Sequence, residues 1–340
     1  MIDINIFFSF FKKNKISFFS GVPDSVLKKT KNYFEKLKNE NHILASNEGS
    51  ATAAAIGYYL ATKKLPCVYF QNSGLGNAIN PLISISHKKV YSIPLFLLIG
   101  WRGAPGKKDE PQHLAKGLIT PKILKLLNIK FCVLTKSNDL KKLKKLLDFA
   151  KKQKTPVACL VKRDIFTDRK NLKNKSNKRI FSGVNREDFL QIFLQKTNKA
   201  SKIISTTGFT SRELFQIRSS RKLKKGKDFY MVGGMGHTSS VALGYSQSSK
   251  NKTICVDGDG SLLMHLGSIK TVGNFANKNF KYILLNNNAH DSVGGQSTYA
   301  NEVDFEKLSK SLGFKNFYSI DDKKNLKKII KKFLTEKKLS

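Results

Sequence analysis

The sequence predicts an α/β protein with two tandem domains, each built on a doubly wound parallel sheet. Short apolar runs alternate with helical patterns in both halves of the 340-residue chain, as in strand–helix–strand units. Residues 162–179 form a charged, Asn-rich stretch without hydrophobic periodicity, and the alternation starts again after it. We therefore expect a first domain over residues 1–165, a linker over 166–185 and a second domain over 186–340, with no third domain between them.

The individual elements follow from the same patterns. The predicted strands cover residues 16–20, 42–46, 66–72, 93–100, 129–134 and 156–161 in the first half, and 201–205, 229–232, 252–256 and 279–285 in the second. Residues 138–154 and 321–338 carry apolar side chains on one stripe with lysines opposite, which predicts amphipathic helices. Residues 4–11 are apolar, but their lysines follow them instead of preceding them. A first helix is therefore expected there, not a secretory signal.

Composition excludes some classes of protein. The chain has 62 lysines and arginines against 24 acidic residues, a formal net charge of +38. The lysines are spread along the polar faces of predicted helices, and no DNA-reading module or base-stacking motif is recognisable, so specific nucleic-acid binding is not expected. No apolar run reaches the roughly 18 residues of a membrane-spanning helix. The four cysteines lie in apolar runs without a Cys-x-x-Cys pair, which favours buried thiols and a cytoplasmic location.

Two loops of the second half carry polar side chains directly after predicted strands. Asp259 follows the run that ends at Val256, and Asn287 follows the run that ends at Leu285, with one helix predicted over residues 262–275. A right-handed crossover places both loops on one edge of the sheet. A carboxylate, an amide oxygen and neighbouring glycines suit Mg²⁺ holding a phosphate-bearing ligand. The alternative is a pair of ordinary turns, since Asp-Gly and Asn-Asn are common turn formers, but their pairing favours the metal site.

A glutamate opens a helix of small residues in the first half. Glu48 follows a predicted strand, and residues 49–57 are almost all small, so this helix can pack very close to a neighbour. The ordinary interpretation is a carboxylate favoured by the helix dipole. Because Ser46 and Asn47 already supply capping candidates, we favour a buried carboxyl that shares a proton with a ligand. No stretch fits a dinucleotide-binding or Walker-type loop, so nicotinamide and nucleotide sites lose support.

Long motifs at the predicted strand ends resemble one family. One motif consists of Gly-Asp-Gly-Ser, a predicted helix and then two asparagines. It is similar to the thiamine-diphosphate motif of the decarboxylase and acetolactate-synthase superfamily, and Glu48 matches the activating glutamate of that superfamily. Within that superfamily the chain resembles the phosphonopyruvate decarboxylases in residues 21–25, 71–81, 99–103, 109–113, 234–237 and 287–296. One departure is Asn288, where the family pattern has glycine; it changes a loop position but leaves the proposed metal-binding side chains intact.

The resemblance implies two domains of the thiamine-diphosphate-binding type. The first domain would bind the pyrimidine ring of thiamine diphosphate, and the second its diphosphate through Mg²⁺. The residues implied for the metal are Asp259, Asn287 and Ala289 (carbonyl), and those implied for the cofactor are Gly233 (carbonyl), Met235, Gly258, Gly260, Ser261, Thr210 and Ser211. Because the cofactor of such enzymes bridges domains of different subunits, a homodimer is the smallest working unit implied.

The implied activity is the non-oxidative decarboxylation of 3-phosphonopyruvate to phosphonoacetaldehyde and CO2, a step of phosphonate biosynthesis. Glu48 would act on the aminopyrimidine ring of the cofactor. Asp24 and His113 are the candidates for proton handling, which needs groups that titrate near neutral pH. The candidates for binding the anionic group of the substrate are Arg102 and Lys107, with Asn72 and Ser73 as neutral donors.

Three alternatives stay open. A sulfopyruvate decarboxylase, or another thiamine-diphosphate-dependent 2-oxo acid decarboxylase, would share the mechanism. In the sulfopyruvate enzymes the two halves are commonly separate chains, so the fused chain favours the phosphonate. A carboligase of the acetolactate-synthase kind is disfavoured because no middle domain is present. A basic nucleic-acid-binding or scaffold protein without activity is disfavoured by Glu48, Asp259 and Asn287.

Overall fold

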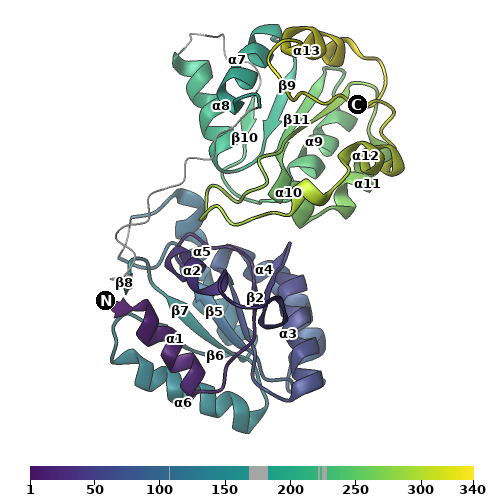
Figure 1. The fold of residues 1–340 in the computed structure, drawn as a ribbon. Helices are drawn as coiled ribbons and strands as arrows, with labels where there is room; N and C mark the ends of the chain where they lie inside the picture. Colours follow the sequence, from purple (N-terminus) through teal and green to yellow (C-terminus); the bar gives the residue numbers. More distant parts are fainter. Residues whose placement is uncertain (107, 168–182, 221–222, 224–227) are drawn as a thin grey trace. The chain divides into compact units, whose positions relative to one another are not determined.

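The computed structural model describes residues 1–106, 108–167, 183–220, 223 and 228–340, and the chain divides into two compact units (Figure 1). Unit 1 comprises residues 1–175 and 293–296, and unit 2 comprises residues 176–292 and 297–340. Most of the predicted linker, residues 168–182, lies outside the described residues, so the predicted domain boundaries stay a prediction. No helix among the described residues combines the length and the apolar character needed to span a bilayer.

Unit 1 is built on a six-stranded parallel sheet. Its strands are β2 (Phe19–Gly21), β3 (His42–Leu44), β4 (Cys67–Gln71), β5 (Phe96–Gly100), β6 (Lys130–Leu134) and β7 (Val157–Val161). They lie in the order β3-β2-β4-β5-β7-β6, and each overlaps a predicted strand. The side chains of β5 and β7 are buried along their whole length, as expected of strands covered on both faces. A separate pair joins β1 (Ile2–Asp3) to β8 (Phe166–Thr167), so the start of the predicted linker belongs to unit 1.

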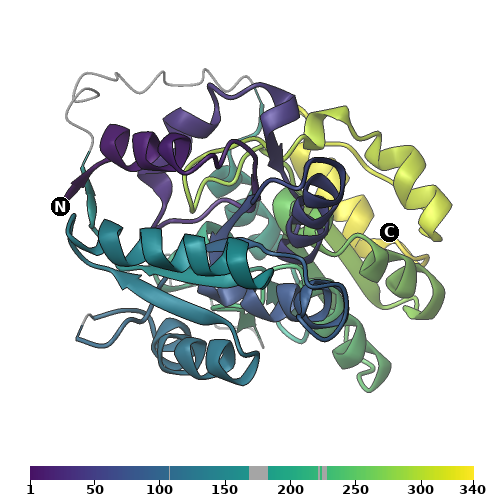
Figure 2. The same cartoon turned by 90° about the horizontal axis from the view of Figure 1, so that it is seen from below.

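Helices cover both faces of this sheet. One face carries α1 (Ile4–Lys13), α2 (Lys31–Phe34) and α6 (Asp139–Gln153), and the other carries α3 (Glu48–Thr62), α4 (Leu75–Pro81) and α5 (Pro111–Leu126). Figure 2 shows the purple α1 and the teal α6 alongside one another, and Lys151 Nζ of α6 donates to the Asn14 carbonyl at the end of α1 at 2.8 Å. Helix α1 forms as predicted because Phe7, Phe8 and Phe11 are buried on one stripe. Single turns lie at η1 (Lys28–Thr30), η2 (Asn39–Asn41), η3 (Asn72–Gly74) and η4 (Leu82–Ser86).

Unit 2 is built on a four-stranded parallel sheet of the same kind. Its strands are β9 (Lys202–Ser205), β10 (Phe229–Tyr230), β11 (Thr253–Gly258) and β12 (Phe280–Leu285), in the order β10-β9-β11-β12. The helices α7 (Arg186–Lys196), α8 (Phe209–Ser220) and α13 (Leu326–Thr335) pack on one face, and α9 (Thr238–Gln247) and α11 (Gly267–Phe275) on the other. The remaining elements are α10 (Asp259–Met264), η5 (Ala300–Glu302) and α12 (Phe305–Leu312).

The single helix predicted over residues 262–275 is wrong. Helix α10 ends at Met264 and α11 begins at Gly267, with His265 between them outside helical geometry (φ −135°, ψ 55°). The His265 ring instead stacks on the His237 ring, with 4.7 Å between the ring centroids. A tertiary ring contact therefore accompanies the break, which the local hydrophobic pattern did not indicate.

Both units confirm the predicted fold class, two doubly wound parallel sheets. The first four strands of each of these two sheets lie in the same order, second-first-third-fourth. In such sheets the strand order reverses between the first and third strands, and ligands bind beyond the carboxyl ends at that point. For unit 1 this point lies between β2 and β4, and for unit 2 it lies between β9 and β11.

Candidate active site

In unit 1 the Glu48 carboxyl is buried at the start of α3. Asn47 caps this helix by accepting a hydrogen bond from the Ser50 N–H at 2.9 Å, so Glu48 is not needed as a cap. Only 5% of Glu48 is exposed, and its Oε2 accepts a hydrogen bond from Asn77 Nδ2 at 2.8 Å. Burial raises the pKa of Glu48, while the Asn77 hydrogen bond and the positive charge of Lys116 act in the opposite direction. The protonated form is therefore easier to populate than in water.

Two glycines leave room for this glutamate and its partner. A Cβ added at Gly74 would collide with Oε1, Cδ and Cγ of Glu48. A Cβ added at Gly49 would lie 2.8 Å from the backbone oxygen of Asn77. The small residues at the start of α3 thus permit the predicted close packing, and the neighbour they approach is α4.

A second buried carboxyl belongs to Asp24, in the loop after β2. Its Oδ1 accepts hydrogen bonds from Gln71 Nε2 and from the Val26 N–H, both at 3.0 Å. Its Oδ2 is buried without a hydrogen-bond partner in the part of unit 1 that the structure describes, and the missing side chain of Gly100 makes space for it. Burial raises the pKa of Asp24. A carboxyl whose pKa is shifted upward is closer to the range that suits the predicted role of Asp24 in proton handling.

His113, the other proton-handling candidate, lies near the start of α5. Burial, followed by the charge of Arg102, lowers its pKa to about 4, so the ring is neutral at pH 7. Its Nδ1 is buried and has no hydrogen-bond partner among the described residues. The pKa of His113 therefore lies below the near-neutral value expected from the sequence. At pH 7 its neutral ring can donate or accept a hydrogen bond or act as a weak base, but it is not an imidazolium acid.

The predicted substrate-binding side chains are mostly occupied within unit 1. The Arg102 guanidinium bonds both carboxylate oxygens of Asp109 through Nε and Nη2, and its Nη1 donates to Ser25 Oγ at 3.1 Å. Asn72 Nδ2 donates to the Arg102 carbonyl and to Thr120 Oγ1, both at 3.0 Å, and Asn72 Oδ1 accepts from the Arg102 N–H at 3.0 Å.

These contacts correct the expected role of Asn72. With its amide fully used and 4% of its surface exposed, it holds the Arg102 loop in place and is not available as a neutral donor to a ligand. Ser73 Oγ donates to Gln71 Oε1 at 2.8 Å and is accessible. Lys107 lies outside the described residues.

Sequence reasoning missed two side chains of this cluster. Asn77 lies inside the motif at residues 71–81, but its hydrogen bond to Glu48 joins α4 to α3 and follows from no local pattern. Lys116 is half-buried, one helical turn after His113, and its charge acts on both Glu48 and His113. Its spacing from His113 on α5 was the available signal, hidden by the abundance of lysine in the chain.

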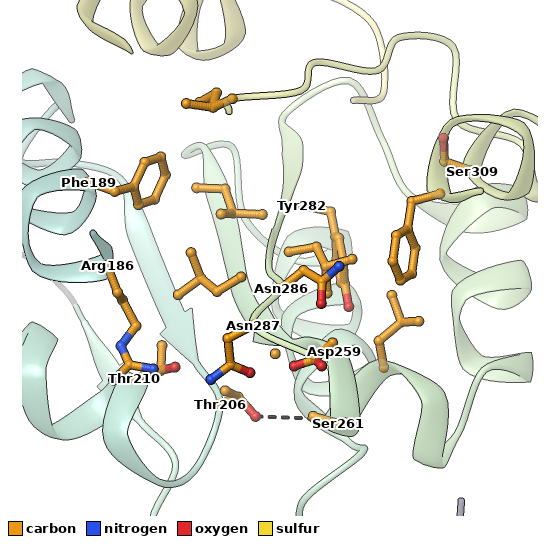
Figure 3. A pocket seen from close by; sticks show the side chains of 18 of the residues that line it. Arg186, Phe189, Thr206, Thr210, Asp259, Ser261, Tyr282, Asn286, Asn287 and Ser309 are labelled. Atoms are coloured by element: carbon orange, nitrogen blue, oxygen red, sulfur yellow. Dashed lines mark hydrogen bonds between the residues drawn. The ribbon is translucent and has the colours of Figure 1, made fainter. Parts of the chain in front are cut away.

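In unit 2 the predicted metal ligands lie together at the carboxyl edge of the sheet. Asp259 follows β11 and Asn287 follows β12, which are paired neighbours, and both line a cavity of about 500 Å³ (Figure 3). Asp259 is 4% exposed and its Oδ2 accepts a hydrogen bond from Thr298 Oγ1 at 2.5 Å. Asn287 Nδ2 donates a hydrogen bond to Asp291. Asn287 Oδ1 accepts only a long hydrogen bond of 3.2 Å from the Ala289 N–H among the described residues, so this oxygen can still bind a ligand.

This donor set fits a magnesium ion. A buried carboxylate and an amide oxygen face the same cavity, and Ala289 also lines it. Mg²⁺ prefers oxygen ligands and keeps positions open for phosphate oxygens and water.

The predicted diphosphate contacts divide into two groups. Thr210, Gly258, Gly260 and Ser261 line the cavity. Ser211 does not, because its hydroxyl is buried against the carbonyl of Thr206 at 2.7 Å. A hydroxyl contact from Ser211 to the diphosphate is therefore wrong.

The loop of the predicted Met235 contact is tied to the same edge. Met235 lines the cavity, and Gly234 and Gly236 on either side of it have positive φ angles of 73° and 86° that favour glycine. Ser261 Oγ accepts the Gly236 N–H at 3.0 Å, so this hydroxyl fixes the Met235 loop. Gly233 is half-buried and is not among the residues that line the cavity.

A further buried carboxylate, Asp257, was missed by sequence reasoning. It is 1% exposed and accepts hydrogen bonds from Tyr282 Oη at 2.9 Å and the Gly258 N–H at 3.0 Å. Thr206 Oγ1 donates to Ser261 Oγ at 3.2 Å beside it. The network joins β9, β11 and β12 at their carboxyl ends and so holds the loops that carry the candidate ligands.

The departure at Asn288 has a simple backbone explanation. Asn288 has a φ of 57°, in the left-handed region. Glycine is the usual residue there, and asparagine is among the few others that adopt it at modest cost. The loop therefore keeps the conformation that the family pattern expects of glycine.

The two units match the two halves of one class of enzyme. Residues 5–120 match the N-terminal TPP binding domain of thiamine pyrophosphate enzymes, and residues 206–340 match their C-terminal TPP binding domain. Thiamine pyrophosphate and thiamine diphosphate are the same cofactor. The chain is thus a thiamine-pyrophosphate enzyme by both of its domains, and the candidate residues lie at the carboxyl edges of both sheets.

Relatives narrow the class to decarboxylases. Phosphonopyruvate decarboxylase from Streptomyces hygroscopicus is 33% identical over 322 residues, covering 89% of this chain and 78% of that protein. Sulfopyruvate decarboxylase from Methanosarcina acetivorans is 28% identical over 322 residues (89% and 81%), and the beta subunit of sulfopyruvate decarboxylase from Methanocaldococcus jannaschii is 33% identical over 129 residues (38% and 66%). The chain belongs to the family of thiamine-pyrophosphate decarboxylases that includes phosphonopyruvate decarboxylase.

Proposed function

We propose that this protein decarboxylates 3-phosphonopyruvate to phosphonoacetaldehyde and CO2. The observation that carries the proposal is the 33% identity to a phosphonopyruvate decarboxylase across both units. The balance is simple: the bond between C1 and C2 breaks, C1 leaves as CO2, and one proton is taken up at C2 to give the aldehyde. No oxidant or second substrate is needed.

The candidate residues divide the work of binding the cofactor. Asp259, Asn287 and the Ala289 carbonyl would hold Mg²⁺, and Thr210 with the Gly258–Ser261 loop would contact the diphosphate. When bound, thiamine diphosphate would supply an electron sink for the bonding pair that stays on C2 when CO2 leaves. Met235, placed by the Gly236 hydrogen bond, would support the cofactor from below.

Glu48 would hold a proton opposite the pyrimidine ring. Its Oε2 is anchored by Asn77, which leaves Oε1 to face a ligand. The raised pKa of this carboxyl favours a shared proton on the ligand side. Asp24, whose raised pKa also comes from burial, is the better candidate for delivering the proton that the product needs, because His113 is neutral at pH 7.

A second candidate substrate is sulfopyruvate. A single-chain sulfopyruvate decarboxylase is 28% identical over the same share of this chain. The fusion of both halves in one chain therefore does not distinguish a phosphonopyruvate decarboxylase from a sulfopyruvate decarboxylase. The expectation that a fused chain favours the phosphonate is corrected accordingly. Phosphonate and sulfonate groups differ in charge at neutral pH, so a direct comparison of kcat/KM for phosphonopyruvate and sulfopyruvate decides between the two substrates.

The test is a CO2-release assay of the purified protein with thiamine diphosphate and Mg²⁺, offered phosphonopyruvate, sulfopyruvate, pyruvate and benzoylformate separately. We expect the highest kcat/KM with phosphonopyruvate. A higher kcat/KM with sulfopyruvate would replace the substrate and keep the reaction. No CO2 from any 2-oxo acid, with cofactor binding verified, would refute the proposal.

We also propose a homodimer whose sites each use unit 1 of one subunit and unit 2 of the other. Mixing two inactive variants, Glu48→Ala and Asp259→Ala, then creates heterodimers with one intact site. If the subunits exchange freely in a two-fold dimer, activity should recover to about a quarter of wild type. No recovery, with heterodimers shown by tagged pull-down, would place both halves of a site in one chain.

A further inference from the structure

The polar face of α5 carries a lysine that the proposed mechanism does not use. His113, Lys116 and Thr120 recur at helical spacing on this face. Thr120 is buried, donates to the Lys116 carbonyl at 2.6 Å and accepts from Asn72, so this part of the helix is firmly placed. The backbone of Lys116 is therefore tied through Thr120 to Asn72 and the Arg102 loop, and its charge acts on the Glu48 carboxyl.

The ammonium group of Lys116 is half-buried and makes no hydrogen bond or ion pair with any of the residues that the structure describes. Glu48, the acidic group whose charge acts on it, directs Oε2 to Asn77 instead. Burial lowers the pKa of Lys116, while the charge of Glu48 acts in the opposite direction. A cation in this state gains most from an anionic ligand.

Arg102, the cation expected from the sequence, is in the opposite state. Asp109 takes two bonds of its guanidinium, and the side chain of Asp109 is only 5% exposed. A substrate anion at Arg102 would have to compete with this carboxylate for the same charge. Lys116, unlike Arg102, has no carboxylate bonded to it among the described residues.

We infer that Lys116 is the specificity-determining residue that binds the anionic group on C3 of the substrate. The inference rests on the proposed function, since it deepens the question of which 2-oxo acid is taken. The chemistry recognised is a tetrahedral oxyanion, a phosphonate or a sulfonate, at the end of a short 2-oxo acid. Arg102 then acts as a positioning residue that orders the loop through Asp109 and Asn72.

The experiment compares Lys116→Met with wild type on two substrates that differ only in the C3 group, phosphonopyruvate and pyruvate. We expect KM for phosphonopyruvate to rise about tenfold or more, as for the loss of one charge-assisted contact, and kcat/KM for pyruvate to fall much less than kcat/KM for phosphonopyruvate. Lys116→Arg should restore part of the phosphonopyruvate affinity. Lys122→Met is the matched control, an exposed lysine on the same helix, and should leave both substrates unaffected.

Two outcomes would overturn the inference. Equal losses for phosphonopyruvate and pyruvate would mean that Lys116 acts through Glu48, and unchanged KM values would mean that it does not meet the substrate. Binding of 3-phosphonopropanoate, which has no ketone and cannot react, separates this test from the proposed function. A tenfold weaker Kd of Lys116→Met for that ligand supports the inference even if wild type releases no CO2, and an unchanged Kd refutes it.

Discussion

Replacing Gly74 by alanine should displace the Glu48 carboxyl while leaving the backbone undisturbed. Gly74 has φ −88° and ψ −3°, which alanine adopts without strain. The added Cβ would stand well inside 3.0 Å of three Glu48 atoms, closer than real Cβ contacts. Because Asn77 holds the other carboxylate oxygen, the group must retreat by roughly 1 Å to reach ordinary contact, and a misplacement of that size costs about 100-fold in rate.

The assay is steady-state CO2 release, with thermal unfolding measured in parallel. We expect kcat of Gly74→Ala to fall about 100-fold, approaching Glu48→Ala, and overpacking to cost about 1–3 kcal/mol of unfolding free energy. Gly76→Ala is the control, since a Cβ there meets nothing within 4 Å. It should keep full activity and gain up to about 1 kcal/mol from helix propensity. Wild-type kcat in Gly74→Ala would show that the placement of the Glu48 carboxyl does not control turnover.

Three further predictions concern unit 2. Asp259→Ala should abolish the Mg²⁺-dependent part of thiamine-diphosphate affinity in a calorimetric titration, and equal affinity with and without Asp259 would contradict the metal assignment. Tyr282→Phe leaves the buried Asp257 carboxylate without one donor, so the free energy of unfolding in urea should drop by about 1–3 kcal/mol, and an unshifted midpoint would argue against that network. Burial lowers the pKa of His290 to about 4, so between about pH 6.5 and 4 the unfolded chain binds more protons there and stability falls with falling pH. Buried carboxyl groups with raised pKa values change the stability of the whole protein in the opposite direction, so the measurement compares two proteins. His290→Asn should lose less free energy of unfolding than wild type between pH 7 and pH 5. An identical loss in both proteins would exclude His290 as a cause.

The sequence predicted correctly those site residues whose positions depend only on where a strand ends. Asp259 and Asn287 lie on one edge because β11 and β12 are neighbours joined by a right-handed crossover, a rule that needs no tertiary detail. Glu48 at the start of α3 was likewise predictable, since a strand, two capping residues and a run of small residues fix where that helix begins. Patterns of period two and 3.6 are local, and these placements depend only on them.

The roles of other polar side chains depend on partners far away in the chain. Asn72 fits a ligand-binding loop by type, yet Arg102 and Thr120, 30 and 48 residues later, use its amide. Arg102 fits an anion site by charge, yet Asp109 neutralises it. Whether a donor is free is decided by these tertiary bonds, and one sequence contains no signal for them.

Each described hydrophobic core lies within one unit: the two cores of unit 1 use residues 2–166 and the two of unit 2 use residues 184–339. Among the described residues, no hydrophobic core therefore combines residues of both units. A break in the chain between residues 167 and 183 would leave these described cores intact. Relatives of similar sequence exist in both arrangements, as one chain and as separate alpha and beta subunits.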